Sequence, residues 1–164
     1  NKDGSIVTPE EGDISRAIAT AYVSILGIEY DQLENKDADL TAQSMIVKLR
    51  LLGLAEQGTN LTLHYGKRDI NDSLNNLKYS NNFWGGSITL YLLSFLGVKG
   101  SYSTFAPVLL SNGSKLEAER ITYGLFLELG LIRVFGNSFN EVTTYSTGVE
   151  TTQKGVETGV KLYF

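Results

Sequence analysis

Apolar and polar residues alternate in short segments along most of this chain. Between residues 44 and 51, the odd-numbered positions hold Met, Val and Leu residues. The even-numbered positions hold Ser, Ile, Lys and Arg. Successive side chains of a β-strand point to opposite faces, so this alternation is typical of strands with two different faces. Clusters of Asn, Asp, Gly and Ser separate the alternating segments and indicate turns or loops. The pattern therefore predicts an all-β chain.

The same reasoning divides the chain into eight predicted strands. They cover approximately residues 15–30, 40–54, 60–67, 83–96, 101–110, 116–135, 139–149 and 155–164. The connections after the first, third, fifth and seventh strands are polar, at residues 31–39, 69–82, 111–115 and 150–154. The other connections are tighter and contain glycine, at residues 55–59, 97–100 and 136–138. Two kinds of connection thus alternate, as they do where short turns and longer loops emerge at opposite ends of a barrel.

The final predicted strand has a clear two-faced pattern and ends on an aromatic residue. It resembles the closing strand of bacterial outer-membrane β-barrels, in which the chain typically ends on Phe after apolar residues at alternate positions. The resemblance implies a location in the bacterial outer membrane and a signal that the barrel-assembly machinery reads during biogenesis. The residues of this expected assembly signal are Val156, Thr158, Val160, Leu162 and Phe164.

The strand pattern and the resemblance together predict an eight-stranded antiparallel up-and-down transmembrane β-barrel. It would be similar in plan to the OmpA transmembrane-domain and OmpX families. An even strand number leaves both termini on the periplasmic side, and Phe164 would close the barrel against the first strand. Residues 13–164 are expected to form this single domain and residues 1–12 a polar N-terminal tail. If the protein is exported, the sequence that begins at Asn1 is expected to be the mature form after signal-peptide removal.

Composition narrows the function classes. The chain has 164 residues, a formal net charge of -4 and no cysteine, so disulfides and thiolate metal sites are excluded. Lys and Arg are scattered rather than clustered with aromatic residues, and no nucleic-acid partner is predicted. No segment reaches the roughly 18 consecutive apolar residues that a membrane-spanning helix needs. The mean hydropathy of -0.06 is compatible with a membrane barrel, whose two-faced strands average to moderate hydropathy.

Aromatic residues are expected to lie at the two membrane interfaces, because their rings are amphipathic. The external rim would carry Tyr30, Phe83 and Trp84, and the periplasmic rim would carry Tyr102, Phe135, Tyr163 and Phe164.

Charged residues opposite the apolar faces are expected to point into the lumen. An eight-stranded lumen is just wide enough to be filled by side chains, and unpaired charges inside it are costly. We therefore predict a charge network that plugs the lumen, with Lys48 or Arg50 reaching across to Glu128. A gated polar pore lined by the same residues is the alternative. The predicted network consists of Lys48, Arg50, Glu128, Glu157 and Lys161.

The polar connection predicted over residues 69–82, with the residues just before it, is expected to make contacts outside the membrane. The expected partners are outer-membrane lipids and lipopolysaccharide, a host surface, or a protein partner in a larger membrane complex. The candidate contact residues are Lys67, Arg68, Asp69, Asp72 and Lys78.

His64 is the only histidine of the chain, and it is predicted to face the lumen. A histidine can act as the base for a serine nucleophile, as in the lipid A-modifying barrels. One branch of those enzymes carries a late His-x-Ser pair, whereas this chain has an early His-Tyr-Gly and no later histidine. Another branch combines His, Asp and Ser, and here Asp69 and Ser73 follow His64 only loosely. No catalytic residue, metal site or cofactor is therefore predicted.

These observations favour a small non-enzymatic outer-membrane barrel that serves envelope structure, surface interaction or association with a larger complex. A narrow channel or a carrier for small hydrophobic molecules is the second hypothesis, since Leu93, Phe95 and Phe126 are nominally inward. A lipid A-modifying enzyme is a further alternative. A soluble lipocalin-like barrel is disfavoured, because the outward apolar faces would meet water and no early Gly-x-Trp signature is present.

Overall fold

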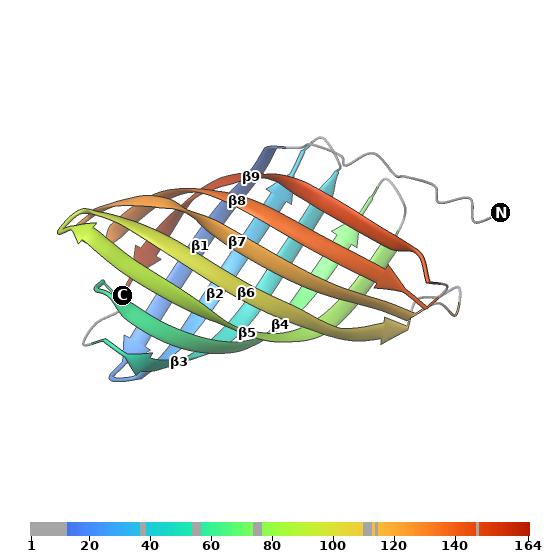
Figure 1. Ribbon diagram of the computed structural model, residues 1–164, viewed down its shortest axis with the longest axis horizontal. Coiled ribbons are helices and arrows are strands. Elements are labelled where there is room, and N and C mark those ends of the chain that lie inside the picture. The colour runs from blue at the N-terminus through green and yellow to red at the C-terminus, as the bar shows by residue number, and fades with distance from the viewer. Residues whose placement is uncertain are drawn as a thin grey trace.

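The computed structural model describes residues 13–36, 39–53, 57–73, 77–109, 113, 115–146 and 148–164. These residues form nine β-strands that close into a barrel, in which neighbours in the sequence pair side by side (Figure 1). None of the described segments forms a helix long and apolar enough to cross a membrane. The tail predicted over residues 1–12 lies outside the described residues. The strands are β1 (Asp13–Val23), β2 (Leu26–Asn35), β3 (Leu40–Leu52), β4 (Asn60–Asp72), β5 (Leu77–Leu93), β6 (Leu96–Leu109), β7 (Lys115–Leu129), β8 (Ile132–Tyr145) and β9 (Glu150–Tyr163).

The all-β closed barrel is confirmed, but the predicted number of eight strands is wrong. The segment expected to be one strand over residues 15–30 is a hairpin of β1 and β2, with Val23 paired to Leu26 across a two-residue turn. Ser24 takes a φ of 59° there, a left-handed conformation that is uncommon without glycine. The turn also shifts the alternation by one position, because outward residues are odd-numbered in β1 and even-numbered in β2.

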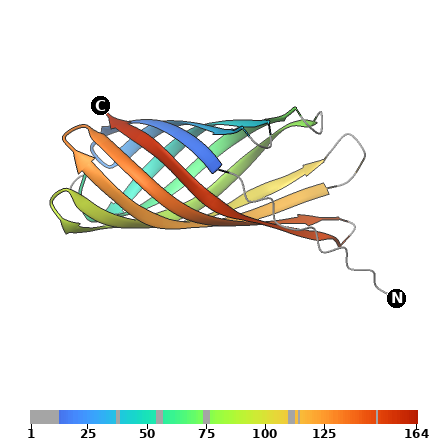
Figure 2. The same cartoon turned by 90° about the horizontal axis from the view of Figure 1, so that it is seen from above.

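An odd number of strands changes how the barrel closes. When nine strands follow one another up and down, the first and the last run in the same direction, and β1 indeed pairs with β9 in parallel from Asp13 and Val156 to Thr20 and Tyr163. The Phe164 amide donates to the carbonyl of Thr20 at 3.0 Å, so the chain closes against the first strand as expected. However, β1 begins and β9 ends at opposite rims of the barrel, as Figure 2 shows. The even strand number expected from the sequence would place the start of the first strand and the end of the last at one rim, and nine strands do not. The periplasmic side expected for both termini stays a prediction.

The two rims differ in their connections. We call the rim with the turns at residues 24–25, 94–95 and 130–131, the connection 53–59 and the end of β9 the turn rim. The opposite rim, with the connections 36–39, 73–76, 110–114 and 146–149, is the extended rim. Most of the predicted polar connection 69–82 belongs to β4 and β5, and the predicted glycine turns 97–100 and 136–138 lie inside β6 and β8. Gly97 serves packing rather than turning, because an added Cβ would collide with the Phe126 ring.

The outer surface is apolar near the turn rim and polar near the extended rim. On β7, the outward residues from Ile121 to Leu129 are apolar and 50% to 75% exposed, whereas Glu119, Glu117 and Lys115 continue the same face. The neighbouring strands change polarity in the same way, and we call the apolar surface the apolar belt. It consists of the outward side chains within residues 17–23, 26–30, 45–51, 61–65, 84–92, 96–102, 121–129, 132–136 and 156–164.

Aromatic side chains mark one edge of this belt rather than two. Tyr30, Tyr65, Trp84 and Tyr102 are 40% to 61% exposed, and each lies next to a polar outward residue of its own strand, although β6 also exposes Leu109 farther toward the extended rim. The predicted placement of Tyr102 at the opposite rim is thus wrong, and Phe164 lies at the turn rim with 78% exposure. The remaining predicted rim aromatics point into the lumen because they occupy inward positions of their strands; they are Phe83, Phe135 and Tyr163.

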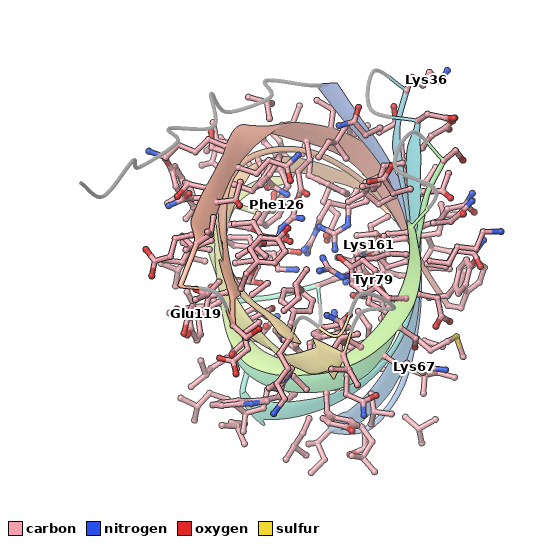
Figure 3. All side chains as sticks on the ribbon, turned by 90° about the vertical axis from the view of Figure 1, so that its right-hand side faces the viewer. Lys36, Lys67, Tyr79, Glu119, Phe126 and Lys161 are labelled. Atoms are coloured by element: carbon pink, nitrogen blue, oxygen red, sulfur yellow. The ribbon has the colours of Figure 1, made fainter. Side chains whose placement is uncertain are left out.

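The inner surface is filled by side chains, as the view along the barrel from the extended rim shows (Figure 3). Phe126 and Lys161 lie inside, whereas Lys67 and Glu119 lie outside. Near the extended rim the interior contains a buried apolar cluster beside polar side chains such as Asn35, and we call this cluster the extended-rim core. It consists of Ile14, Leu33, Ala42, Ile70 and Phe139, with Leu40 and Tyr79 packed against it.

Candidate functional site in the lumen

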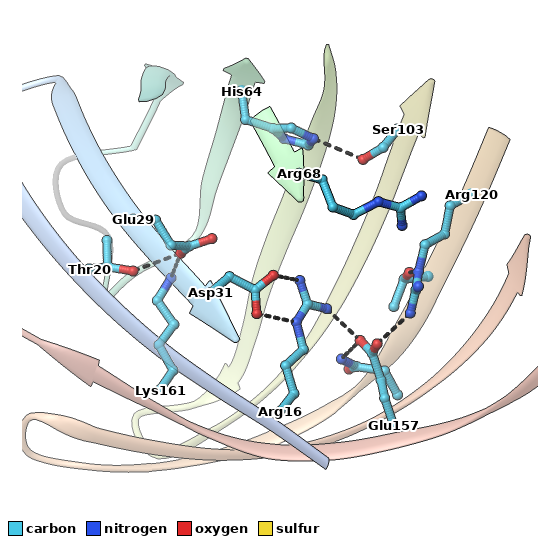
Figure 4. A network of polar contacts seen from close by, with 12 residues as sticks. Arg16, Thr20, Glu29, Asp31, His64, Arg68, Ser103, Arg120, Glu157 and Lys161 are labelled. Atoms are coloured by element: carbon cyan, nitrogen blue, oxygen red, sulfur yellow. Dashed lines mark hydrogen bonds and ion pairs between the residues drawn. The ribbon is translucent and has the colours of Figure 1, made fainter. Parts of the chain in front are cut away.

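A chain of alternating arginines and carboxylates crosses the lumen (Figure 4). Arg16 on β1 binds Asp31 on β2 at 2.6 Å and Glu157 on β9 at 2.8 Å. Glu157 also accepts from Arg120 on β7 at 2.6 Å. Arg120 and Arg68 then share Glu141 on β8 at 3.2 Å and 3.4 Å. Six strands are therefore connected by ion pairs: β1, β2, β4, β7, β8 and β9.

Glu157 is the centre of this chain. Its side chain has no solvent exposure, and the Asn137 amide donates to it at 2.9 Å in addition to the two arginines. A buried carboxylate is stable only when hydrogen bonds satisfy its oxygens, and charge-assisted bonds to guanidinium groups are among the strongest available. Glu157 thus fixes the positions of Arg16 and Arg120 across the barrel.

Glu141 lies where the outer surface is already polar, close to the extended rim. Burial alone would raise the pKa of this carboxyl group, but the charges and hydrogen bonds of Arg68 and Arg120 outweigh burial and hold the pKa below its usual value. Arg68 and Arg120 also lie over aromatic rings, at 3.7 Å from the Phe105 centroid and 4.3 Å from the Phe139 centroid. Ionised Glu141 therefore binds two arginines that also pack on buried aromatic rings.

A second cluster surrounds Glu29, closer to the turn rim. Lys48 on β3 and Lys161 on β9 bind the same Glu29 oxygen at 2.5 Å and 2.9 Å, and the Thr20 hydroxyl donates to it at 2.6 Å. The charge of Lys99 on β6 also acts on Glu29. Glu29 is thus bound by two lysines from two strands.

A third cluster is found beside the β7–β8 turn. Glu128 binds Arg133 at 2.7 Å and accepts from the Tyr91 hydroxyl at 2.8 Å. The expectation that Lys48 or Arg50 reaches Glu128 is therefore wrong. Glu128 and Arg133 are directly opposite in the register of β7 and β8, so a partner on the adjacent strand is available at much shorter reach. Arg50 instead donates to the carbonyl of Ser24 at 2.6 Å.

The structure places all residues of the predicted lumen set on inward faces, but it divides them among separate groups. Their exposed fractions run from 0% for Glu157 to 8% for Glu128. Arg16, Glu29 and Asp31 were missed because the hairpin at residues 24–25 was not recognised. Arg68 lies just beyond the predicted end of its strand, Lys99 lies in a predicted turn, and Arg133 follows the unrecognised turn at residues 130–131. Correct alternation within each strand would have placed them inside. The missed lumen residues are Arg16, Glu29, Asp31, Arg68, Lys99, Arg120, Arg133 and Glu141.

The predicted external contact residues do not lie in a loop. Lys67 and Asp69 are outward on β4, 61% and 63% exposed and 3.6 Å apart, and Lys78 is exposed on β5. Asp72 ends β4. Arg68 is buried in the lumen, because its neighbours Lys67 and Asp69 take the outward positions of the strand. Arg68 as an external contact is therefore wrong.

His64 does meet a serine, although not one suggested by its neighbours in the sequence. Its Nε2 lies 2.9 Å from the Ser103 hydroxyl on β6, while Asp69 points outward from the same strand. A serine nucleophile needs a base at this distance, and the base is in turn oriented by a third group. No carboxylate in the described part of the chain hydrogen-bonds to the His64 ring. The pair therefore has part of a catalytic arrangement only.

The inward residues leave a cavity of about 110 Å³ in the middle of the barrel. Several of its wall residues on β5, β6 and β7 are small hydroxyl residues: Ser87, Ser101, Ser103 and Thr122. Among the described residues, no group of three or more His, Asp or Glu side chains is placed to hold a metal ion. Two of the apolar residues suggested for an apolar lumen, Leu93 and Phe95, are instead 53% and 47% exposed at the turn rim.

Comparisons of this chain with protein-family models, with curated proteins and with solved structures found no match.

Proposed function

We propose that the protein is a small integral outer-membrane β-barrel with a lumen filled by side chains, and that its role is non-enzymatic. It serves envelope structure, surface interaction or association with a larger membrane complex. The observation that carries the proposal is the distribution of polarity between the outside and the inside of the barrel. Near the turn rim, leucines point outward while lysines, arginines and glutamates are buried.

This distribution is the reverse of that expected in water. Large apolar residues of soluble proteins are normally buried, and exposed apolar patches rarely exceed a few hundred Å². In a bilayer, outward apolar side chains contact lipid, and closure of the barrel satisfies the backbone hydrogen bonds of every strand. The strands contain 10 to 17 residues, which meets the 9 to 11 residues that a tilted membrane strand needs. The row of Tyr and Trp at the edge of the apolar belt supports an interface there.

The filled lumen favours a structural or interaction role over conduction. Ion pairs join strands across the barrel, and Arg133 and Glu128 occupy the interior beside the turn rim. The outward polar residues near the extended rim are then the surface available to lipopolysaccharide or a protein partner, with Lys67, Asp69 and Lys78 as candidate contacts. The terminal residues from Val156 to Phe164 remain the proposed assembly signal. Nine strands depart from the eight-stranded plan of the OmpA-domain and OmpX families, so the proposal is limited to the wider class.

Membrane fractionation after export in a Gram-negative host tests this function. We expect the protein in the outer-membrane fraction, released only by detergent, with gel migration that changes on heating. Full solubility in plain buffer would reject the proposal. Lipid A of unchanged mass after expression is also expected; a modified lipid A would support the enzymatic alternative that the His64 and Ser103 contact leaves open.

A matched pair of variants tests which surface contacts lipid. Leu125→Arg puts a charge into the apolar belt and costs about 2 to 4 kcal/mol if it faces the middle of a bilayer. Glu117→Arg places the same residue on the same face of β7 but beyond the belt, where water solvates it. We expect a strong loss of heat-resistant folded protein in the membrane for Leu125→Arg and little for Glu117→Arg. Equal assembly of both variants would contradict the assigned belt.

A further inference from the structure

Strands β5 and β6 separate before they reach the extended rim. Their antiparallel ladder ends at the pair Phe83 and Phe105. Beyond this pair β5 continues over residues 77–82, which are paired with β4, and β6 continues to Leu109. Figure 2 shows the ends of β6 and β7 at the extended rim apart from those of β4 and β5. Within the described part of the chain, residues 77–82 have a strand partner on one side only, and we call them the β5 edge.

The sequence of β6 explains why the ladder ends there. If the register continued, Pro107 would lie opposite Asn81, and proline has no amide hydrogen to donate to a ladder. The pairing of β6 with β7 also shifts between Phe105 and Val108, at the same level, and a bulge of this kind bends its strand. An edge strand presents a row of amide and carbonyl groups to which another chain can add a strand.

Polar side-chain atoms beside the β5 edge also have no partner. Asn81 is an inward residue with 4% exposure, and neither the nitrogen nor the oxygen of its amide group is hydrogen-bonded to any described residue. Arg68 lies opposite Asn81 on β4, and its Nε is likewise buried without a partner, while its other nitrogens bind Glu141. Buried polar groups of folded proteins are nearly always hydrogen-bonded. A group that both donates and accepts hydrogen bonds would satisfy all three atoms.

We propose that the β5 edge binds an extended peptide segment of a partner protein as an added strand, with an Asn or Gln side chain opposite Asn81. The peptide backbone would continue the ladder that β6 leaves, in the manner of β-strand addition. Side chains of directly opposite residues lie on the same face of a sheet. The carboxamide oxygen would accept from Asn81 and from Nε of Arg68, and the carboxamide nitrogen would donate to the Asn81 oxygen.

The surroundings of the β5 edge fit a peptide better than a lipid. Its outward side chains, Lys78, Ser80 and Asn82, are polar and exposed. An acyl chain could not hydrogen-bond to the backbone of the edge or to Asn81. The inference rests on the interaction role within the proposed function, for which it names the partner class, but not on the membrane location.

The experiment is a titration of the full chain with a fluorescently labelled synthetic peptide, Thr-Asn-Thr-Val-Thr-Val, followed by fluorescence anisotropy. The protein is folded in detergent micelles, or kept in buffer if it proves soluble, so a failed membrane proposal leaves this test intact. We expect saturable binding, with slower hydrogen exchange of backbone amides within residues 77–82. The same peptide with alternate amides N-methylated loses backbone donors and should bind about tenfold or more weakly.

A matched pair of variants tests the side-chain part of the site. Asn81→Leu removes the buried amide group and should weaken binding of the peptide about fivefold. Asn82→Leu makes the same change at the next residue, which is exposed on the outward face, and should leave binding unchanged. If Asn81→Leu does not fold, the wild type is titrated instead with the peptide whose Asn is replaced by Val, and the same loss is expected.

Three results would overturn the proposal. The first is no saturable binding of the peptide to folded wild-type protein. The second is equal binding of the N-methylated peptide, because contacts of side chains alone would then explain the signal. The third is equal weakening by Asn81→Leu and Asn82→Leu, or exchange protection that falls outside residues 77–82. None of these results bears on the membrane location, which fractionation tests separately.

Discussion

The two ends of the barrel differ in how polar and apolar side chains are divided between the outer surface and the interior. Near the extended rim the outer surface is polar and the interior holds the apolar cluster around Phe139. Near the turn rim the outer surface is apolar and the interior holds charged pairs such as Glu128 and Arg133. The strands make the same kind of backbone hydrogen bonds in both halves of the barrel. The difference in polarity between the halves therefore comes from the side chains alone. The outer surface of the extended-rim half therefore has the polarity expected in water, and the outer surface of the turn-rim half has the polarity that the proposed membrane location requires.

The largest expected effect comes from breaking the charge chain. Glu157→Gln removes the carboxylate charge between Arg16 and Arg120, which leaves buried guanidinium groups less compensated. Loss of one partner of a buried ion pair typically costs about 3 to 5 kcal/mol. Urea unfolding of the protein in micelles measures this loss. Glu150→Gln, at an exposed position of the same strand, is the control and should stay within about 0.5 kcal/mol of wild type. Equal stability of Glu157→Gln and wild type would contradict a structural role for the chain.

A somewhat smaller effect is expected from the extended-rim core. Phe139→Ala leaves a cavity beneath Arg120 and should cost about 3 kcal/mol of unfolding free energy. Leu125→Ala removes an exposed side chain of the apolar belt, where surrounding lipid or detergent fills the space and no internal cavity forms. Urea unfolding of both variants should therefore show the larger loss for Phe139→Ala. The reverse order would mean that the apolar belt, rather than the extended-rim core, is the packed surface.

The smallest expected effect is a dependence on pH. Because the folded barrel lowers the pKa of Glu141, its contribution to stability is fully present above the unfolded value of about 4.3 and is lost as pH falls through the folded pKa. The stability difference between wild type and Glu141→Gln should accordingly be constant near neutral pH and shrink under acid conditions. Unfolding free energies measured across this range test it, with exposed Glu117→Gln as the control. A difference that grows on acidification would contradict the assigned ion pairs.

The alternation of residues was enough to predict a closed all-β barrel and the inward faces of Lys48, Glu157 and Lys161. It failed at the turn of residues 24–25, because Ser and Ile replace the usual turn residues and the apolar pattern continues through the turn. It also ended strands too early near the extended rim. Polar side chains there suggest a loop, but the backbone ladder continues between β4 and β5 as far as Asp72 and Leu77.

The partners inside the lumen were harder to predict than the faces. Glu128 was assigned to a strand across the barrel, whereas register places Arg133 beside it. The number and tilt of the strands determine which charged side chains face each other across the lumen. One additional strand therefore changes the partners of residues on distant strands. The pairing of Arg16 with Glu157 and of His64 with Ser103 joins residues far apart in the sequence. Such contacts follow from the closed geometry and have no local sequence signal.

The parallel pairing of β1 with β9 has a consequence for protein engineering. A segment attached before β1 leaves the barrel from the rim opposite to that of a segment attached after β9. In a membrane, labels fused at the two positions would be exposed to different compartments, and protease added from one side would remove only one of them. If the barrel spans a membrane as proposed, its odd strand number would make it a scaffold whose two fusion points report on opposite faces of the bilayer.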